Sequence, residues 1–139
     1  MKKLILLAIV FMIPLLGNAQ NIDKPFRAYL YNNEYDVYLR IDFYDESITI
    51  PGQELYGKLP GYLGKKNNSF CWVITSVEVS GPIAHLSMIN DYGSEDLTAT
   101  LTAASDSLFV LKQVDGSSLK VPKNGKWQKL PKTLELKRR

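Results

Sequence analysis

The 139-residue sequence is poor in the side chains on which stapled domains and many small enzymes depend, because it holds one cysteine, Cys71, and one histidine, His85. A disulfide needs two cysteines, so a disulfide-stapled scaffold is excluded, and a Cys/His zinc site fails for the same reason. His85 could act as a base only if folding brought a nucleophile and a carboxylate to it, so we assign no catalytic residue. We interpret Cys71, between two aromatic residues, as a small buried hydrophobe; a reactive thiol is the alternative.

Only one long hydrophobic run is present, and it lies at the start of the sequence. The 13 residues from Leu4 to Leu16 follow Lys2 and Lys3 and precede Gly17-Asn18-Ala19. A basic start, an apolar run and a small-residue cleavage site predict a signal peptide over residues 1–19; an uncleaved anchor is the alternative. No cysteine follows the run, so we expect an exported protein, periplasmic or secreted, that is not a lipoprotein and has no transmembrane segment in its mature chain.

The mature part of the sequence has no amphipathic helical stretch longer than two turns, and its apolar residues repeat with a period of two. Alternate side chains of a strand point to opposite faces, so this period places apolar residues on one face. Residues 70–79 are apolar on both phases at first, which predicts a strand covered on both sides or the best-buried strand. The alternation is clearest over residues 35–44, where one face holds Tyr35, Val37, Leu39, Ile41 and Phe43, and the other holds Asp36, Tyr38, Arg40, Asp42 and Tyr44.

Turn-forming residues separate these runs and set the expected strand boundaries. The dipeptide Asp115-Gly116 predicts a type I′ hairpin between its neighbouring strands. The longest connection, 51–68, is rich in glycine and should be mobile or held by its own side chains. We expect strands at about 26–32, 35–44, 47–50, 69–79, 83–89, 96–103, 107–114, 117–121 and 132–137, with a weaker one at 54–59.

These strands predict a single all-β domain over residues 20–139. About 8–9 short strands joined in sequence form an antiparallel meander, and closure into an up-and-down β-barrel would remove its exposed edges. A two-sheet β-sandwich uses the same strands and turns and is the alternative.

Charge is distributed unevenly along the mature chain. Residues 20–111 carry 6 basic and 12 acidic side chains, whereas residues 112–139 carry 9 basic and 2 acidic ones. The basic C-terminal segment 112–139 could contact phosphate, lipid headgroups or an acidic partner; a solvated, lysine-rich edge is the alternative. The net charges of these two parts, −6 and +7, nearly cancel. We expect no nucleic-acid partner.

A metal site has only one candidate, the loop that holds Asp91, Glu95 and Asp96. Clustered oxygen ligands beside a glycine are what Ca²⁺ requires, but the spacing of the twelve-residue calcium loop is absent. An ordinary hairpin turn uses the same residue types. We therefore predict no metal and no cofactor, and retain this loop only as a weak candidate.

The chain is rich in tyrosine, with eight residues of this type. Its ring is apolar and its hydroxyl polar, which suits recognition surfaces, although strands also favour tyrosine for packing. The candidate binding residues are Tyr38, Arg40, Tyr44, Tyr56 and Tyr62. We expect an exported noncatalytic binding protein of the bacterial cell envelope, whose partner is an unknown small ligand or envelope protein. The alternatives are an inhibitor or accessory subunit of an exported enzyme, and a small hydrolase, which a contact between Cys71 and His85 would favour.

Overall fold

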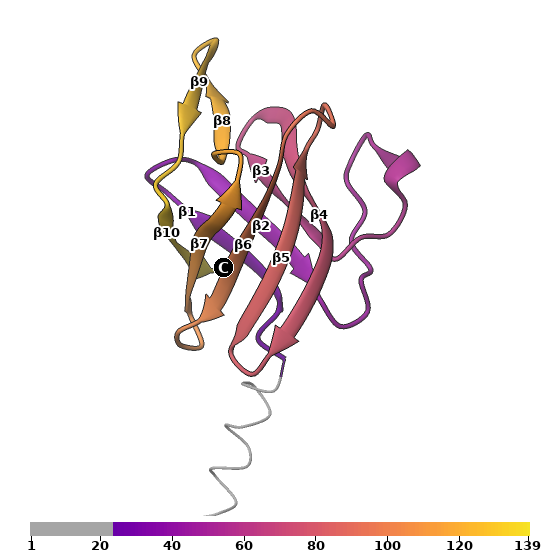
Figure 1. Ribbon diagram of the computed structural model, residues 1–139, viewed down its shortest axis with the longest axis vertical. Helices are drawn as coiled ribbons and strands as arrows, with labels where there is room; N and C mark the ends of the chain where they lie inside the picture. Colours follow the sequence, from indigo (N-terminus) through magenta and orange to yellow (C-terminus); the bar gives the residue numbers. More distant parts are fainter. Residues whose placement is uncertain (1–23) are drawn as a thin grey trace, which may run out of the picture.

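The computed structural model describes residues 24–139, so the signal peptide predicted at 1–19 lies outside the described part. These residues form a closed antiparallel β-barrel with a small separate hairpin (Figure 1). One 3₁₀ turn, η1 (Glu54–Tyr56), precedes β3. The strands are β1 (Arg27–Asn32), β2 (Val37–Asp42), β3 (Gly61–Lys65), β4 (Asn68–Ser80), β5 (Ile83–Asn90), β6 (Asp96–Ala103), β7 (Leu108–Gly116), β8 (Lys120–Lys123), β9 (Lys126–Lys129) and β10 (Thr133–Arg138).

The barrel is an up-and-down meander, which confirms the predicted fold and decides against a sandwich. Strands β1 to β7 pair with their neighbours in sequence, β7 pairs with β10, and β10 closes the wall against β1. The β8–β9 hairpin is inserted between β7 and β10 and forms its own two-stranded sheet. Residues 24–139 contain no helix with the length and apolar character that spanning a bilayer requires.

The inward face of the strands follows the predicted alternation. In β2, Val37, Leu39 and Ile41 are buried while Arg40 is exposed. The inward side chains of the wall strands join one hydrophobic cluster that includes the fully buried Trp72 and Phe109. Side chains of this size fill a small barrel, so its interior is a packed core.

Part of the outer wall is also covered, which explains the two-phase apolar pattern of residues 70–79. Trp72 and Ile74 point into the barrel core, whereas Cys71 and Val73 join a second cluster with Ile50. Residues 43–60, which we call the cover segment, carry Ile50 over this outer face. The prediction that this strand is covered on both sides is therefore confirmed for residues 70–74, whereas most of residues 75–80 are exposed.

The expected connection 51–68 was wrong in part, because residues 61–65 form β3. Gly61 and Gly64 obscured this strand, since glycine is depleted in strands and often marks close backbone approach. The strand expected at 47–50 is reduced to one bridge between Ile48 and Leu59, and the weak strand at 54–59 is replaced by η1.

The predicted hairpin at Asp115-Gly116 was also wrong. Gly116 is the last residue of β7 and pairs with Leu97 of β6, so β7 does not fold back onto β8. The hairpin instead turns at Asn124-Gly125, where both residues have positive φ, as a type I′ turn requires. Asn-Gly and Asp-Gly both suit this turn, so the dipeptide alone does not decide between the two positions.

Candidate functional site

A groove of about 390 Å³ lies on the outer wall of the barrel across β1, β2 and β3. We call it the tyrosine groove. Its volume falls within the range of small-ligand sites. Residues from the wall strands, from the β3–β4 turn and from the end of the chain line it: Tyr29, Tyr31, Tyr38, Arg40, Tyr62, Lys66, Asn67 and Arg139.

Strand register brings the aromatic rings of the groove together. Tyr31 pairs with Tyr38, and Tyr29 pairs with Arg40, so Tyr29 and Tyr38 are diagonal neighbours on one face. Their rings stack with centroids 5.6 Å apart. The ring of Tyr38 also meets Tyr62 edge to face at 5.8 Å. Packed rings of this kind have few alternative rotamers, so the aromatic wall of the groove is held in place before any ligand arrives.

Gly64 makes room for the central ring. It pairs with Tyr38 across β2 and β3. A Cβ atom at Gly64 would lie closer to Cζ of Tyr38 than real Cβ atoms come to their neighbours. The glycine therefore lets the Tyr38 ring lie flat over β3, and it serves packing rather than loop flexibility.

Positive charge borders the same groove. Arg40, Lys66 and Arg139 are cationic, and its lining includes no acidic side chain. The Arg139 guanidinium carbon lies 4.3 Å from the centre of the Tyr31 ring, in a cation–π contact. Asp36 lies beside the groove, and its Oδ1 accepts a hydrogen bond from the Tyr31 hydroxyl at 3.1 Å.

The Tyr38 hydroxyl is held neutral. Burial, followed by the hydrogen bond and charge of the neighbouring Tyr62, raises its pKa to about 12. At physiological pH the hydroxyl therefore remains a hydrogen-bond donor and acceptor. The groove thus combines neutral hydroxyls, aromatic faces and three cationic side chains.

The structure brings three of the five predicted binding residues together and separates the other two. Tyr38 and Arg40 line the tyrosine groove, and Tyr62 lines it from beneath with only 3% of its surface exposed. Tyr44 lies elsewhere, and its hydroxyl accepts a hydrogen bond from the Phe26 amide at 3.0 Å.

Tyr56 also lies outside the groove, within η1. Its hydroxyl donates to the Asp91 carbonyl at 3.3 Å and joins η1 to the β5–β6 loop. Tyr44 and Tyr56 are exposed in part, but their hydroxyls are already used in contacts within the barrel.

Strand register also brings in residues that the sequence reasoning missed. Tyr29 and Tyr31 of β1 lie beside β2. The length of the connection between the two strands does not reveal their register, so it does not show which side chains become neighbours. Arg139 reaches β1 only because β10 closes the barrel, where its amide donates to the Tyr29 carbonyl at 3.0 Å. The alternation of Tyr29, Leu30 and Tyr31 was the available signal, since it places both tyrosines outside.

The weak metal candidate forms no ligand cluster. Within residues 24–139, no group of three or more His, Cys, Asp or Glu side chains is arranged to hold a metal ion. In the candidate loop, Glu95 pairs with Lys120 at 3.1 Å. The buried Asn90 side chain shapes the turn instead, because its Oδ1 accepts hydrogen bonds from the Ser94 and Glu95 amides at 2.9 and 3.2 Å.

Cys71 and His85 lie far apart. Cys71 is buried, and burial, followed by the charge of Asp91, raises the pKa of its thiol to about 12. His85 is exposed on β5 and pairs with Glu78, seven residues beyond Cys71 along β4. Seven residues of strand span roughly 23 Å. The two side chains therefore cannot form a dyad, and the contact that would have favoured a hydrolase is not made.

Comparison with known proteins adds no functional assignment, since no protein family model, curated protein or solved structure matches the chain.

Proposed function

We propose that this is an exported, noncatalytic binding protein of the bacterial cell envelope, and that the tyrosine groove holds its ligand. The observation that carries the proposal is the pre-packed set of tyrosines bordered by three cations on the outer wall. The core cluster fills the barrel interior, so a ligand has to bind on the outside.

The groove chemistry defines a class of ligand. Aromatic faces pack against the apolar faces of sugar rings, and tyrosine hydroxyls bond to their oxygens. Arginine binds carboxylate or phosphate with two parallel hydrogen bonds, and Arg40 and Arg139 both line the groove. An anionic sugar, carrying uronate or phosphate, combines these two features.

Titration calorimetry with matched oligosaccharides tests the proposal. We expect a uronate-containing oligosaccharide to bind, and a neutral oligosaccharide of the same length to bind at least tenfold more weakly. Replacing Arg40 with glutamine should weaken binding of the acidic sugar about 10- to 100-fold, because a hydrogen bond to a charged group contributes about 1.5–3 kcal/mol.

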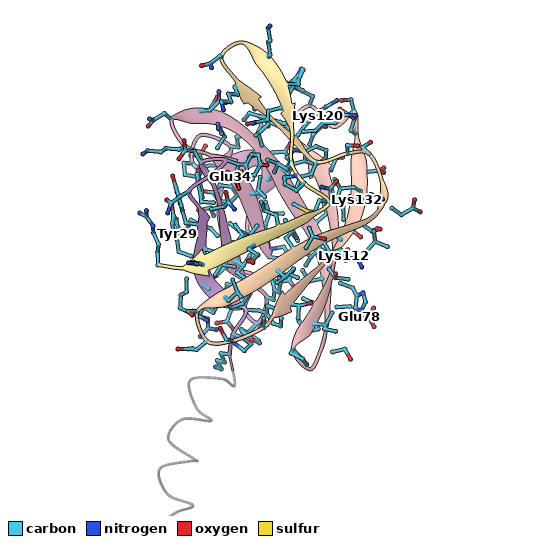
Figure 2. All side chains as sticks on the ribbon, turned by 90° about the vertical axis from the view of Figure 1, so that its left-hand side faces the viewer. Tyr29, Glu34, Glu78, Lys112, Lys120 and Lys132 are labelled. Carbon is cyan, nitrogen blue, oxygen red and sulfur yellow. The ribbon has the colours of Figure 1, made fainter. Side chains whose placement is uncertain are left out.

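Lys112→Gln is the matched control, because it also removes one positive charge. Lys112 is exposed on β7, and Figure 2 shows it well away from Tyr29 on the barrel wall. The Lys112→Gln variant should bind the acidic oligosaccharide like the parent protein. Equal weakening by both substitutions would mean that only net charge matters, and binding of a glutamate-rich peptide in place of the sugar would favour a protein partner. Either result would contradict the proposal.

A further inference from the structure

The β8–β9 hairpin forms a second surface that shares no residue with the tyrosine groove. It projects beyond one end of the barrel (Figure 1). Its root is fixed, because Val121 and Leu130 are buried in the barrel core and the Trp72 indole N–H donates to the Lys120 carbonyl at 2.8 Å. Its tip, Asn124-Gly125, is exposed. The hairpin is therefore a firmly rooted protrusion rather than a frayed end.

Two exposed aromatic rings lie on this protrusion and beside it. Trp127 of β9 is 49% exposed, and Tyr92 of the β5–β6 loop is 71% exposed. Both contact the buried Phe70: Trp127 meets it edge to face at 5.0 Å, and Tyr92 stacks on it at 5.7 Å. Large aromatic side chains held rigidly in solvent are typical of an interaction surface.

The hairpin carries only positive charge. Its cross-strand pairs include Lys120 opposite Lys129 and Lys123 opposite Lys126. Like charges directly opposite each other destabilise a sheet. Lys120 is partly compensated by Glu95 at 3.1 Å, whereas the other three form no ion pair within residues 24–139. An anionic partner would relieve this repulsion.

We propose that this hairpin docks by its projecting end on an anionic lipid bilayer. Lys120, Lys129 and Trp127 lie on one face of the ribbon, with Tyr92 of the β5–β6 loop near Trp127, and Lys123 and Lys126 lie on the other face at the tip. Tryptophan and tyrosine favour the boundary between headgroups and acyl chains, where an apolar ring and a polar group are both accommodated. Lysines beside them contact lipid phosphates and are attracted by the negative surface potential. A projecting hairpin suits a broad planar surface, whereas a small anion is held better in a concave site.

Tryptophan fluorescence offers a direct readout. The chain has two tryptophans, and Trp72 is fully buried, so a change on adding lipid reports on Trp127. We expect vesicles of phosphatidylglycerol and phosphatidylcholine in equal parts to shift the emission to shorter wavelength and to cosediment the protein. Lipids brominated on the acyl chain should quench Trp127, and pure phosphatidylcholine vesicles should bind at least tenfold more weakly.

Paired charge variants locate the binding surface. Lys123→Gln with Lys126→Gln should weaken partitioning onto the anionic vesicles about 25-fold, at about fivefold for each lysine. Lys112→Gln with Lys137→Gln removes the same charge from β7 and β10 and should change partitioning much less. All four lysines are exposed, so the variants should fold alike, and thermal unfolding checks this.

Several results would overturn the proposal. Absence of vesicle binding at low salt would exclude the bilayer. An equal loss of vesicle binding in the two double variants would show that net charge, and not the hairpin, determines binding. Binding of soluble inorganic phosphate or polyglutamate with a fluorescence change equal to that on vesicles would show that the surface takes a free anion or an acidic protein instead.

Discussion

Asp42 is a charged side chain buried at the end of β2, with 5% of its surface exposed. Burial by itself raises the pKa of its carboxyl. Hydrogen bonds from the Ser47 hydroxyl, from the Asp45 and Tyr44 amides and from Arg27 outweigh burial and hold that pKa below its usual value. The carboxylate thus closes the turn after β2, and its role is structural.

This environment predicts a pH-dependent stability. A group whose pKa is lowered by folding stabilises the protein above its unfolded-state value of about 3.9, and that contribution is lost as the pH falls through the folded-state pKa. Asp42→Asn should lower the free energy of unfolding by about 2 kcal/mol at pH 7. Urea unfolding at pH 7, 5 and 3 should show the difference from the parent protein shrinking below pH 4. The exposed Asp106→Asn is the control, and a difference independent of pH would contradict this role.

Gly64 is the second residue with a specific structural consequence. Gly64→Ala puts a methyl group against the Tyr38 ring and should destabilise the barrel by about 1–3 kcal/mol, as overpacking does. In a Tyr38→Ala background, Gly64→Ala should lower the free energy of unfolding much less, because the obstructing ring is gone. A double-mutant cycle by urea unfolding measures this coupling. Equal costs in both backgrounds would show that Gly64 serves the backbone alone.

Among the elements, the cover segment over β3 and β4 has the clearest testable role. Ile50 is 3% exposed and packs with Cys71, Val73 and Tyr62. Ile50→Ala should therefore lower the free energy of unfolding by about 2 kcal/mol or more and uncover the Cys71 thiol. The rate of Cys71 labelling by a thiol reagent under native conditions is the measurement.

The parent protein should label slowly, because burial hides the thiol and its pKa of about 12 leaves little thiolate. Ile83→Ala, which truncates a partly exposed residue of β5, is the matched control and should leave the labelling rate unchanged. Fast labelling of the parent protein, at the rate of an unfolded chain, would show that the cover segment does not protect Cys71.

Element by element, sequence reasoning succeeded where the side chains alternate and failed where packing decides. The alternation in 35–44 and 96–103 placed β2 and β6 correctly, because a pattern of alternate burial can be recognised from consecutive residues alone. Strand β3 could not be recognised, since Gly61 and Gly64 are needed for contacts with Arg40 and Tyr38 on a different strand. The tyrosine groove was predicted only in part for the same reason, because the register between β1 and β2 is a tertiary property.

On the scale of the whole molecule, the barrel has one seam that joins distant parts of the sequence. Strand β1 pairs with β10 through Leu30 opposite Arg138 and Tyr31 opposite Lys137. The Asn32 side chain adds a hydrogen bond to the Glu135 carbonyl, 103 positions away along the chain. Pairing over such separations has the largest loop-closure entropy, so we expect this seam to form late in folding.

The tyrosine groove straddles that seam, with Tyr29 and Tyr31 on one side of it and Arg139 on the other. Before the wall closes, the groove lacks Arg139, so the complete groove forms only when β10 has paired with β1. Conversely, a bound anion that contacts both sides would hold β1 and Arg139 together. Occupancy would then stabilise the closed barrel by mass action, and its free energy of unfolding would rise with the ligand concentration.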